Sequence, residues 1–400
     1  MKINPGLLKL DLFCKGIKID KSCDLYNDSR PILRTRGGLG SGLELVLPEG
    51  LYINVPVEEH FVEKTPYILL KTNDGYFIKK NNDAICKVQL PPRPEFYSAR
   101  TSTGKLMSRI AVMQGTYLAV YPSRICEFWQ MSPKMNCKFC SVGLNVGNTE
   151  EHEKSVKEVL ETVKAARSEL KISFVHFNTG YLYGQELDVL GPYIRAVKKE
   201  TGLLVGVQCP PNPDLSKYNH LKRIGTDHVS FCLEVNNPQR FKEVCPGKYE
   251  YIGQKKYWEA VEYCVKIFGK GKVAGEIIAG LEEPTDTIRA IENFAKIGAV
   301  STVCIFRPCL GTALDTLNPP EAEEMAPIFR RLYEVCLESG IPIGIAPNIK
   351  VGLVLLPEEG RFFVDAIPGR FLWRRCILFL LKILYRIYFN IRIGSHTAKR

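Results

Sequence analysis

The sequence contains no fixed-period repeat, no low-complexity tract and no collagen-like glycine spacing, although 32 of its 400 residues are Gly and 25 are Pro. These absences exclude a solenoid and a fibrous protein. With 45% hydrophobic and 24% charged residues, the chain has enough apolar material for a sizeable core, which excludes disorder. We therefore expect two or three domains, or one large α/β barrel with additions.

Acidic residues are missing from the last part of the chain. The formal net charge is +11, and residues 370–400 hold eight basic residues and no Asp or Glu, so the first 369 residues carry only +3. A nearly neutral body gives no electrostatic footprint for a nucleic acid, and we expect no nucleic-acid partner.

The first residues also lack a recognisable export signal. Residues 1–13 hold two Lys and no apolar run followed by a small-residue cleavage site, so we expect a cytoplasmic protein. In that reducing compartment the 14 cysteines are expected to be thiols or metal ligands rather than disulfides.

From about residue 118 to 357, short β-branched or aromatic runs alternate with amphipathic stretches. This alternation predicts βαβ units around a parallel sheet. The predicted strands are 117–125, 172–177, 203–208, 228–234, 273–280 and 302–306, with further strands at 341–346 and 351–356; the predicted helices are 156–168, 187–199, 257–268, 285–296 and 322–339.

We expect an α/β fold with a partial or complete (β/α) TIM-like barrel, with a doubly wound open sheet as the alternative. The barrel is preferred because polar residues gather at the carboxyl ends of several strands, where barrel active sites form. It should span residues 115–360. Residues 1–114 are predicted to form a β-rich N-terminal extension and linker, and residues 361–400 a basic amphipathic helix and tail.

The segment directly after the first predicted barrel strand carries three cysteines: Cys126, Cys137 and Cys140, in the pattern C-x10-C-x2-C. A [4Fe-4S] cube held by three thiolates leaves one iron open to a small molecule. The alternative is a structural zinc site, but such sites are almost always closed by four protein ligands. His152 is the only nearby candidate for a fourth ligand.

Three cysteines ending in C-x-aromatic-C after the first strand of a parallel barrel resemble the radical S-adenosylmethionine (SAM) superfamily. The usual spacing there is C-x3-C-x2-C, so the long first spacer is atypical. The resemblance covers about residues 110–320. It implies that Cys126, Cys137 and Cys140 hold a [4Fe-4S] cluster and that Phe139 lies against SAM.

Four later stretches extend the resemblance. Asn178, Thr179 and Gly180 follow the second strand, where the family carries a Gly-Gly-Glu-like turn for the SAM amino group; an ordinary strand-to-helix turn is the alternative. Residues 228–248 resemble lipoyl synthases, and by that similarity Glu234 would contact SAM, with a structural salt bridge as the alternative. Gly280 ends a glycine-rich strand resembling the one that contacts adenine, and residues 308–314 resemble the closing loop of biotin synthases.

The resemblance implies a radical SAM enzyme. Its reduced cluster would split SAM into methionine and a 5'-deoxyadenosyl radical, which would take a hydrogen atom from an unidentified substrate. A one-electron donor of the ferredoxin or flavodoxin type would then be a partner. The competing interpretation is a noncatalytic iron-sulfur or zinc-binding protein that is recruited to a membrane surface.

The C-terminal segment 371–393 is apolar apart from Asn390 and five basic residues. Its basic side chains fall on one helical stripe and the opposite side is apolar. The longest uninterrupted apolar run is only Cys376–Leu381, too short to span a bilayer. We expect an interfacial helix at the inner face of the membrane, which makes a lipid-like substrate worth considering. A partner-protein or self-association helix and docking onto the barrel are the alternatives.

Overall fold

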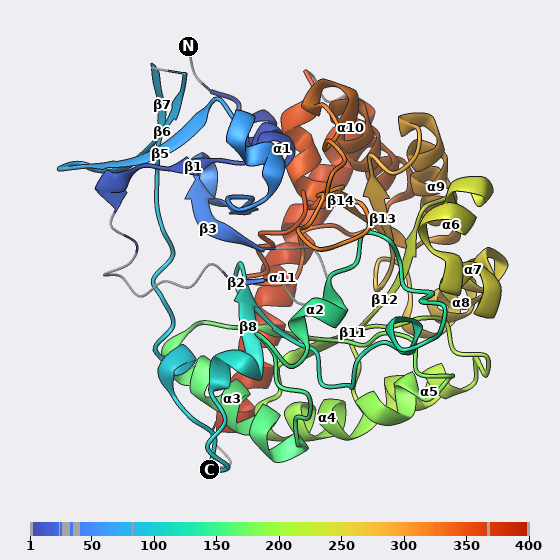
Figure 1. Cartoon of the computed structure of the whole chain (residues 1–400). Coiled ribbons are helices and arrows are strands. Elements are labelled where there is room, and N and C mark those ends of the chain that lie inside the picture. Colours follow the sequence, from blue (N-terminus) through green and yellow to red (C-terminus); the bar gives the residue numbers. More distant parts are fainter. Residues whose placement is uncertain are drawn as a thin grey trace.

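The computed structural model describes residues 3–23, 25, 33–34, 41–81, 83–365 and 369–397. Its centre is a seven-stranded sheet in the order β14-β13-β12-β11-β10-β9-β8 (Figure 1). The strands β9 to β14 are all parallel, and β8 runs antiparallel to β9 at the edge. Their bounds are β8 Ala111–Gln114, β9 Tyr117–Val120, β10 Phe174–Asn178, β11 Leu204–Gln208, β12 His228–Glu234, β13 Val273–Ala279 and β14 Val300–Ile305.

Helices follow the parallel strands in alternation, as predicted. The longer ones are α3 Val156–Glu169, α4 Glu186–Thr201, α8 Gln254–Phe268, α9 Pro284–Ile297 and α10 Ala322–Ser339; the shorter ones are α2 Val142–Asn145, α5 Lys217–Arg223, α6 Pro238–Val244 and α7 Pro246–Tyr251. The predicted ends of β12 and α10 are correct to the residue. Because neighbouring strands in the sheet follow one another in the chain, the sheet is curled in the manner of a barrel, and the doubly wound alternative is wrong.

Two predicted strands are absent. The segments 341–346 and 351–356 are irregular, and within them Leu355 alone makes a bridge, antiparallel to Val303 of β14. Pro342 removes a donor that a strand would need, and Gly344 and Asn348 have positive φ angles of 63° and 52°. The barrel is therefore partial, and irregular chain rather than strands follows β14.

The residues before the barrel form one helix and two small sheets. The helix α1 Pro5–Lys15 begins after Asn4, whose side chain accepts hydrogen bonds from the first turn; the sequence analysis predicted only a β-rich extension here and missed this helix. One sheet has the order β1-β5-β6-β7 and the other β2-β3-β4. Their bounds are β1 Lys18–Ile19, β2 Leu33–Arg34, β3 Ser41–Leu47, β4 Leu51–Val55, β5 Tyr67–Thr72, β6 Gly75–Lys80 and β7 Asp83–Val88.

The predicted C-terminal helix is present as α11 Leu372–Thr397. It contacts α4 (Figure 1). Arg392 of α11 pairs with Asp227 at 3.7 Å, and Asp227 directly precedes β12. This contact places α11 at the amino-terminal ends of the parallel strands. Among the helices of the described residues, none combines the length and apolarity needed to cross a membrane.

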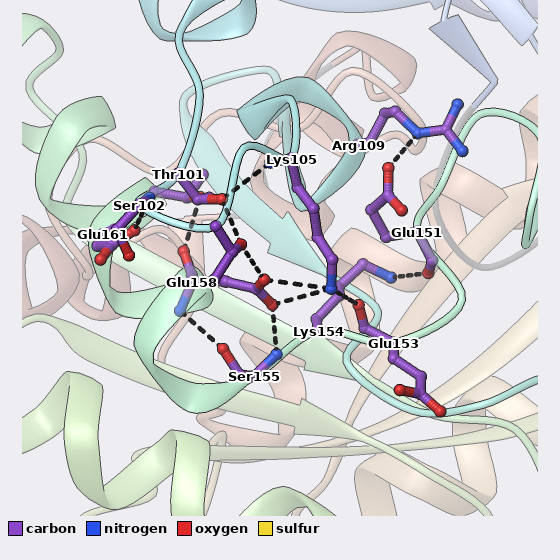
Figure 2. Close-up of polar contacts among 12 residues, drawn as sticks. Thr101, Ser102, Lys105, Arg109, Glu151, Glu153, Lys154, Ser155, Glu158 and Glu161 are labelled. Carbon is purple, nitrogen blue, oxygen red and sulfur yellow. Dashed lines mark hydrogen bonds and ion pairs between the residues drawn. The ribbon is translucent and has the colours of Figure 1, made fainter.

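A polar network joins residues 101–109 to residues 151–161 (Figure 2). Lys154 is buried, and its ammonium donates to the carbonyl of Tyr121 at 2.7 Å and to that of Glu151 at 2.9 Å. Glu158 accepts from Thr103, from Lys105 at 3.2 Å and from the backbone of Ser155 at 2.7 Å. The network thus connects the linker, the start of α3 and the end of β9, five residues before Cys126.

Burial alone would raise the pKa of Glu158, but hydrogen bonds from Thr103, Ser155 and Lys105 outweigh it and lower the pKa to about 2. The folded state therefore binds this proton less readily than the unfolded state, so the carboxylate stabilises the fold above the ordinary pKa, and this contribution is lost as pH falls toward about 2. We expect Glu158→Gln to lower the melting temperature by a few degrees at pH 7 and the deficit to shrink below about pH 4.5. Thermal unfolding across this range is the measurement; a deficit independent of pH would contradict the assignment.

Candidate functional site

The three predicted ligand cysteines lie in the loop that joins β9 to α2, at the carboxyl end of the sheet. Cys126 precedes a short 3-10 turn, and the amide of Cys140 donates to the carbonyl of Cys137 at 3.1 Å, which closes the C-x-x-C turn. Burial raises the pKa of Cys126 to about 11, and the charge of Cys137 raises it further. Burial likewise raises the pKa of Cys140, and both other thiols add to the shift. The three thiols therefore share one electrostatic neighbourhood.

In the part of the chain that the structure describes, no group of three or more His, Cys, Asp or Glu side chains could hold one metal ion. His152, the expected fourth ligand of a zinc site, packs its ring against Gly147.

Gly180 is the residue that makes room for Cys126. A Cβ atom on Gly180 would lie 2.3 Å from Cβ and 2.9 Å from Sγ of Cys126. The next amide, of Tyr181, donates to Sγ of Cys126 at 3.4 Å. The turn that the sequence assigned to SAM thus positions one of the predicted cluster ligands.

A fourth thiol, not expected from the sequence, lies beside Cys137. Cys245, between α6 and α7, is fully buried, and its thiol donates a hydrogen bond to Cys137. This bond lowers the pKa of Cys137 against the effect of burial, and the nearby ammonium of Lys248 lowers it further. Burial and the same contact raise the pKa of Cys245. The sequence interpretation that no further Cys lies near the triad is wrong.

Glu234 stands where β12 bulges against β13. It has a positive φ of 70°, and the pairing register shifts between Cys232 and Glu234. Such bulges turn a side chain toward a site at a strand end. Its carboxylate pairs with Lys248 at 2.7 Å, and Lys248 also donates to the carbonyl of Cys232 at 2.8 Å. The salt bridge weighed as the alternative is therefore present, and Glu234 also lines the central cavity.

The other predicted SAM residues differ in what surrounds them. Asn178 lines the cavity; its amide nitrogen donates to Gln208 at 2.8 Å, and its buried oxygen has no partner. Thr179 donates to Ser123 at 2.9 Å. Phe139 is buried and lines the cavity. Gly280 does not line the cavity. It has a φ of 97° and packs against Pro320, and both features explain why a glycine is needed at this position.

The cavity lies against the inner face of the sheet and has a volume of about 730 Å³. At the carboxyl end of the strands it is lined by Phe139, Asn178 and Glu234. At the other end it reaches α11. A volume of this size suits a small-molecule site.

A polar cluster in the middle of the cavity was missed by sequence reasoning. Glu276 of β13 accepts from Ser230 at 2.6 Å and from Gln208. Burial raises the pKa of Glu276 to about 7, although hydrogen bonds from Ser230 and Cys232 lower it. The sequence signal that could have identified Glu276 is that it is the single acidic residue in the otherwise apolar run 273–280.

Two histidines lie nearer to the amino-terminal ends of the strands. His176 and His228 are both paired with Gly206, from either side of β11, and their ring centroids lie 6.4 Å apart. Burial lowers the pKa of His176 to about 3 and that of His228 to about 4, so both are neutral at neutral pH. Neither was singled out as a functional residue from the sequence.

No protein-family model matches the chain. A curated protein of Chlorobaculum limnaeum, bacteriochlorophyllide c C-7(1)-hydroxylase, is 31% identical over 114 residues, which is 28% of this chain and 28% of that protein. The chain thus matches little more than a quarter of that relative's length.

Solved structures give distant similarities. Methylornithine synthase has a TM-score of 0.44 at 16% identity, over 59% of this chain and 73% of its own. A radical SAM methyltransferase from Sphaerobacter thermophilus has a TM-score of 0.42 at 14% identity, over 70% and 76%. At these scores and identities the similarities do not define a function.

The contact between Gly180 and Cys126 generates a prediction. Gly180→Ala places a methyl group inside the space of Cys126, so we expect the variant to fold but to retain much less iron after anaerobic reconstitution. Gly191→Ala is the matched control, because its added Cβ meets only Ile224 at 3.8 Å and Ala favours a helix. Iron content and circular dichroism are the measurements; equal iron in both variants would contradict the positioning role.

Proposed function

We propose that this protein is a radical SAM enzyme whose cluster is held by Cys126, Cys137 and Cys140. One observation carries the proposal: the thiols of Cys126, Cys137 and Cys140 act on one another electrostatically within one loop at the carboxyl end of a partial barrel, beside a cavity of about 730 Å³. The resemblance of the C-x-aromatic-C segment to the superfamily supports it. A barrel like those of biotin and lipoyl synthases is the narrower form of the proposal, supported by residues 228–248 and 308–314 alone.

The residues present fit a [4Fe-4S] cluster and SAM. When bound, the cluster supplies one electron that splits SAM into methionine and a 5'-deoxyadenosyl radical. Asn178 has a buried oxygen without a partner at the cavity wall, and it would accept a hydrogen bond from the SAM ammonium. Phe139 and Glu234 would border the same molecule.

The chain's other contribution is electrostatic. Ionised thiols are costly to bury without a compensating charge or hydrogen bond. Lys248 supplies a buried positive charge beside Cys137, and the amide of Tyr181 and the thiol of Cys245 donate to cluster ligands. These groups would hold the ligands in their ionised form, while the cavity wall excludes water from the radical.

The substrate is proposed as a molecule with an unactivated C–H bond. The curated relative is named as a hydroxylase of bacteriochlorophyllide c. This name supports a reaction at a carbon position of the substrate. A ferredoxin- or flavodoxin-type protein would donate the electron. The competing proposal is a noncatalytic cluster or zinc protein, and it predicts no cleavage of SAM.

Substitution of a ligand tests the proposed activity. We expect Cys140→Ala to abolish release of 5'-deoxyadenosine from SAM and dithionite in anaerobically purified protein. Cys86→Ala is the control, because Cys86 lies on β7 outside the barrel and should leave the release intact. Liquid chromatography of the products gives the measurement. If the unchanged protein binds one equivalent of zinc and releases none of this product, the noncatalytic alternative is correct.

A second experiment separates an open cluster from a closed one. Cys245 donates to Cys137 rather than serving as a ligand in the proposal, so Cys245→Ala should retain the iron of the unchanged protein. Loss of that hydrogen bond should lower the reduction potential of the cluster, because hydrogen bonds to the sulfur ligands raise it. Iron analysis and an electron paramagnetic resonance titration are the measurements. Iron loss as severe as in Cys140→Ala would make Cys245 a fourth ligand and refute the open site.

A further inference from the structure

The central cavity changes in character from one end to the other. At the carboxyl ends of the strands it is lined by Asn178 and Glu234, and in the middle by Gln208 and Glu276. Toward the amino-terminal ends the lining holds apolar side chains, Phe174, Leu204, Val300, Ile343, Ile345 and Val351, together with the charged residues Asp227, Lys270, Lys272 and Glu358. This end of the cavity therefore combines an apolar wall with charged groups.

The apolar end of the cavity is bounded by α11. Leu381, Leu384, Tyr385 and Tyr388 of this helix all line it. Three of the four also belong to the exposed surface: Leu384 is 62% exposed, Tyr388 55% and Leu381 40%. The same side chains thus border both the interior of the barrel and the outside of the molecule.

The outward side of α11 is apolar. Phe389 is buried against the protein, and residues about 180° around the helix from it face away. These include Leu380, 58% exposed, Ile387, 52%, and Ile391, 68%. Such a continuous exposed apolar face on a described helix indicates a contact with another apolar phase.

The charges of α11 identify that phase as an anionic bilayer. Arg375, Lys382 and Arg386 are exposed and lie within about 40° of one another, on a flank about 20–60° around the helix from buried Phe389. In a helix that lies in the membrane interface, this arrangement places apolar side chains among the acyl chains and basic groups at the level of the phosphates. A soluble protein partner would not require basic groups along that flank.

We propose that a membrane-dissolved amphiphile with a long apolar portion enters the barrel at the α11 end of the cavity, polar end first. The inference rests on the proposed function for the reaction that follows, but the binding step does not require it. The polar end reaches the cluster of Gln208 and Glu276, and the apolar portion stays between residues 343–351 and α11. This order leaves the SAM residues at the opposite end of the cavity from the membrane.

The exposed Cys376 allows the membrane contact to be measured on the full-length protein. It lies on the outward face of α11, so an environment-sensitive dye on its thiol should shift its emission to the blue with vesicles of phosphatidylglycerol and phosphatidylcholine. Vesicles of phosphatidylcholine alone should give a much smaller shift. Cys376→Ser treated with the dye corrects for the other cysteines. The absence of any shift with the anionic vesicles would overturn the proposal.

Entry into the cavity is tested with cis-parinaric acid carried in the same anionic vesicles. Uptake by the unchanged protein should be saturable. Ala346→Trp narrows the cavity from the irregular segment that follows α10, and Leu384→Trp narrows it from α11; each should weaken uptake several-fold while retaining binding to the vesicles. If both variants bind vesicles and take up the probe as the unchanged protein does, the cavity is not the entry route.

The two proposals fail separately. Uptake is measured without SAM, and cleavage of SAM is measured without vesicles. A protein that takes up the probe but releases no 5'-deoxyadenosine contradicts the radical SAM activity and retains the entry route. A protein that cleaves SAM but neither binds anionic vesicles nor takes up the probe contradicts this inference alone.

Discussion

The parallel sheet stops at β14, so no further strands close the barrel. Other parts of the chain must cover the inner face of the sheet, which carries both apolar and polar side chains. Residues 341–356 cross this side as irregular chain, and α11 lies beyond them at the amino-terminal ends of the strands. Irregular chain and one helix fill less of the space than two more strands and their side chains would. The cavity of about 730 Å³ is the consequence, and both its polar and its apolar end derive from how the sheet is left open.

At the carboxyl end, the electrostatic balance decides what the loop after β9 can bind. The cysteines of the triad are buried or partly buried, and removal from water opposes the ionisation of their thiols. Lys248 is the compensating charge, and it is held by Glu234 at 2.7 Å and by a carbonyl of β12. The bulge that gives Glu234 its positive φ thus has a structural effect. It directs the Glu234 carboxylate toward Lys248, which lies beside Cys137.

Much of this arrangement could be predicted from the sequence. The features that could not be predicted have one cause in common. The alternation of strands and helices is local, so β12 and α10 were predicted to the residue. The strands expected at 341–346 and 351–356 failed because their apolar composition was weighed above Pro342 and the glycine nearby. Cys245 was missed because it is 105 residues from Cys140 along the chain, and only the fold brings α6 and the C-x-x-C turn together. Glu276 was interpreted only as part of a glycine-rich strand. Its position inside the cavity depends on the pairing register between β13 and β12, which the sequence does not show.

The C-terminal helix α11 is a second case in which a local sequence pattern does not determine a tertiary contact. Helical periodicity separates a basic stripe from an apolar face, but it does not say which of them meets the protein. A helix that docks by its widest apolar face would bury that face and leave its charges in water. In α11 the narrow stripe containing Phe389 is buried, the basic flank lies beside it, and the wide apolar face remains outside. Contact with the barrel and contact with a second apolar phase are therefore compatible, because they use different sides of one helix.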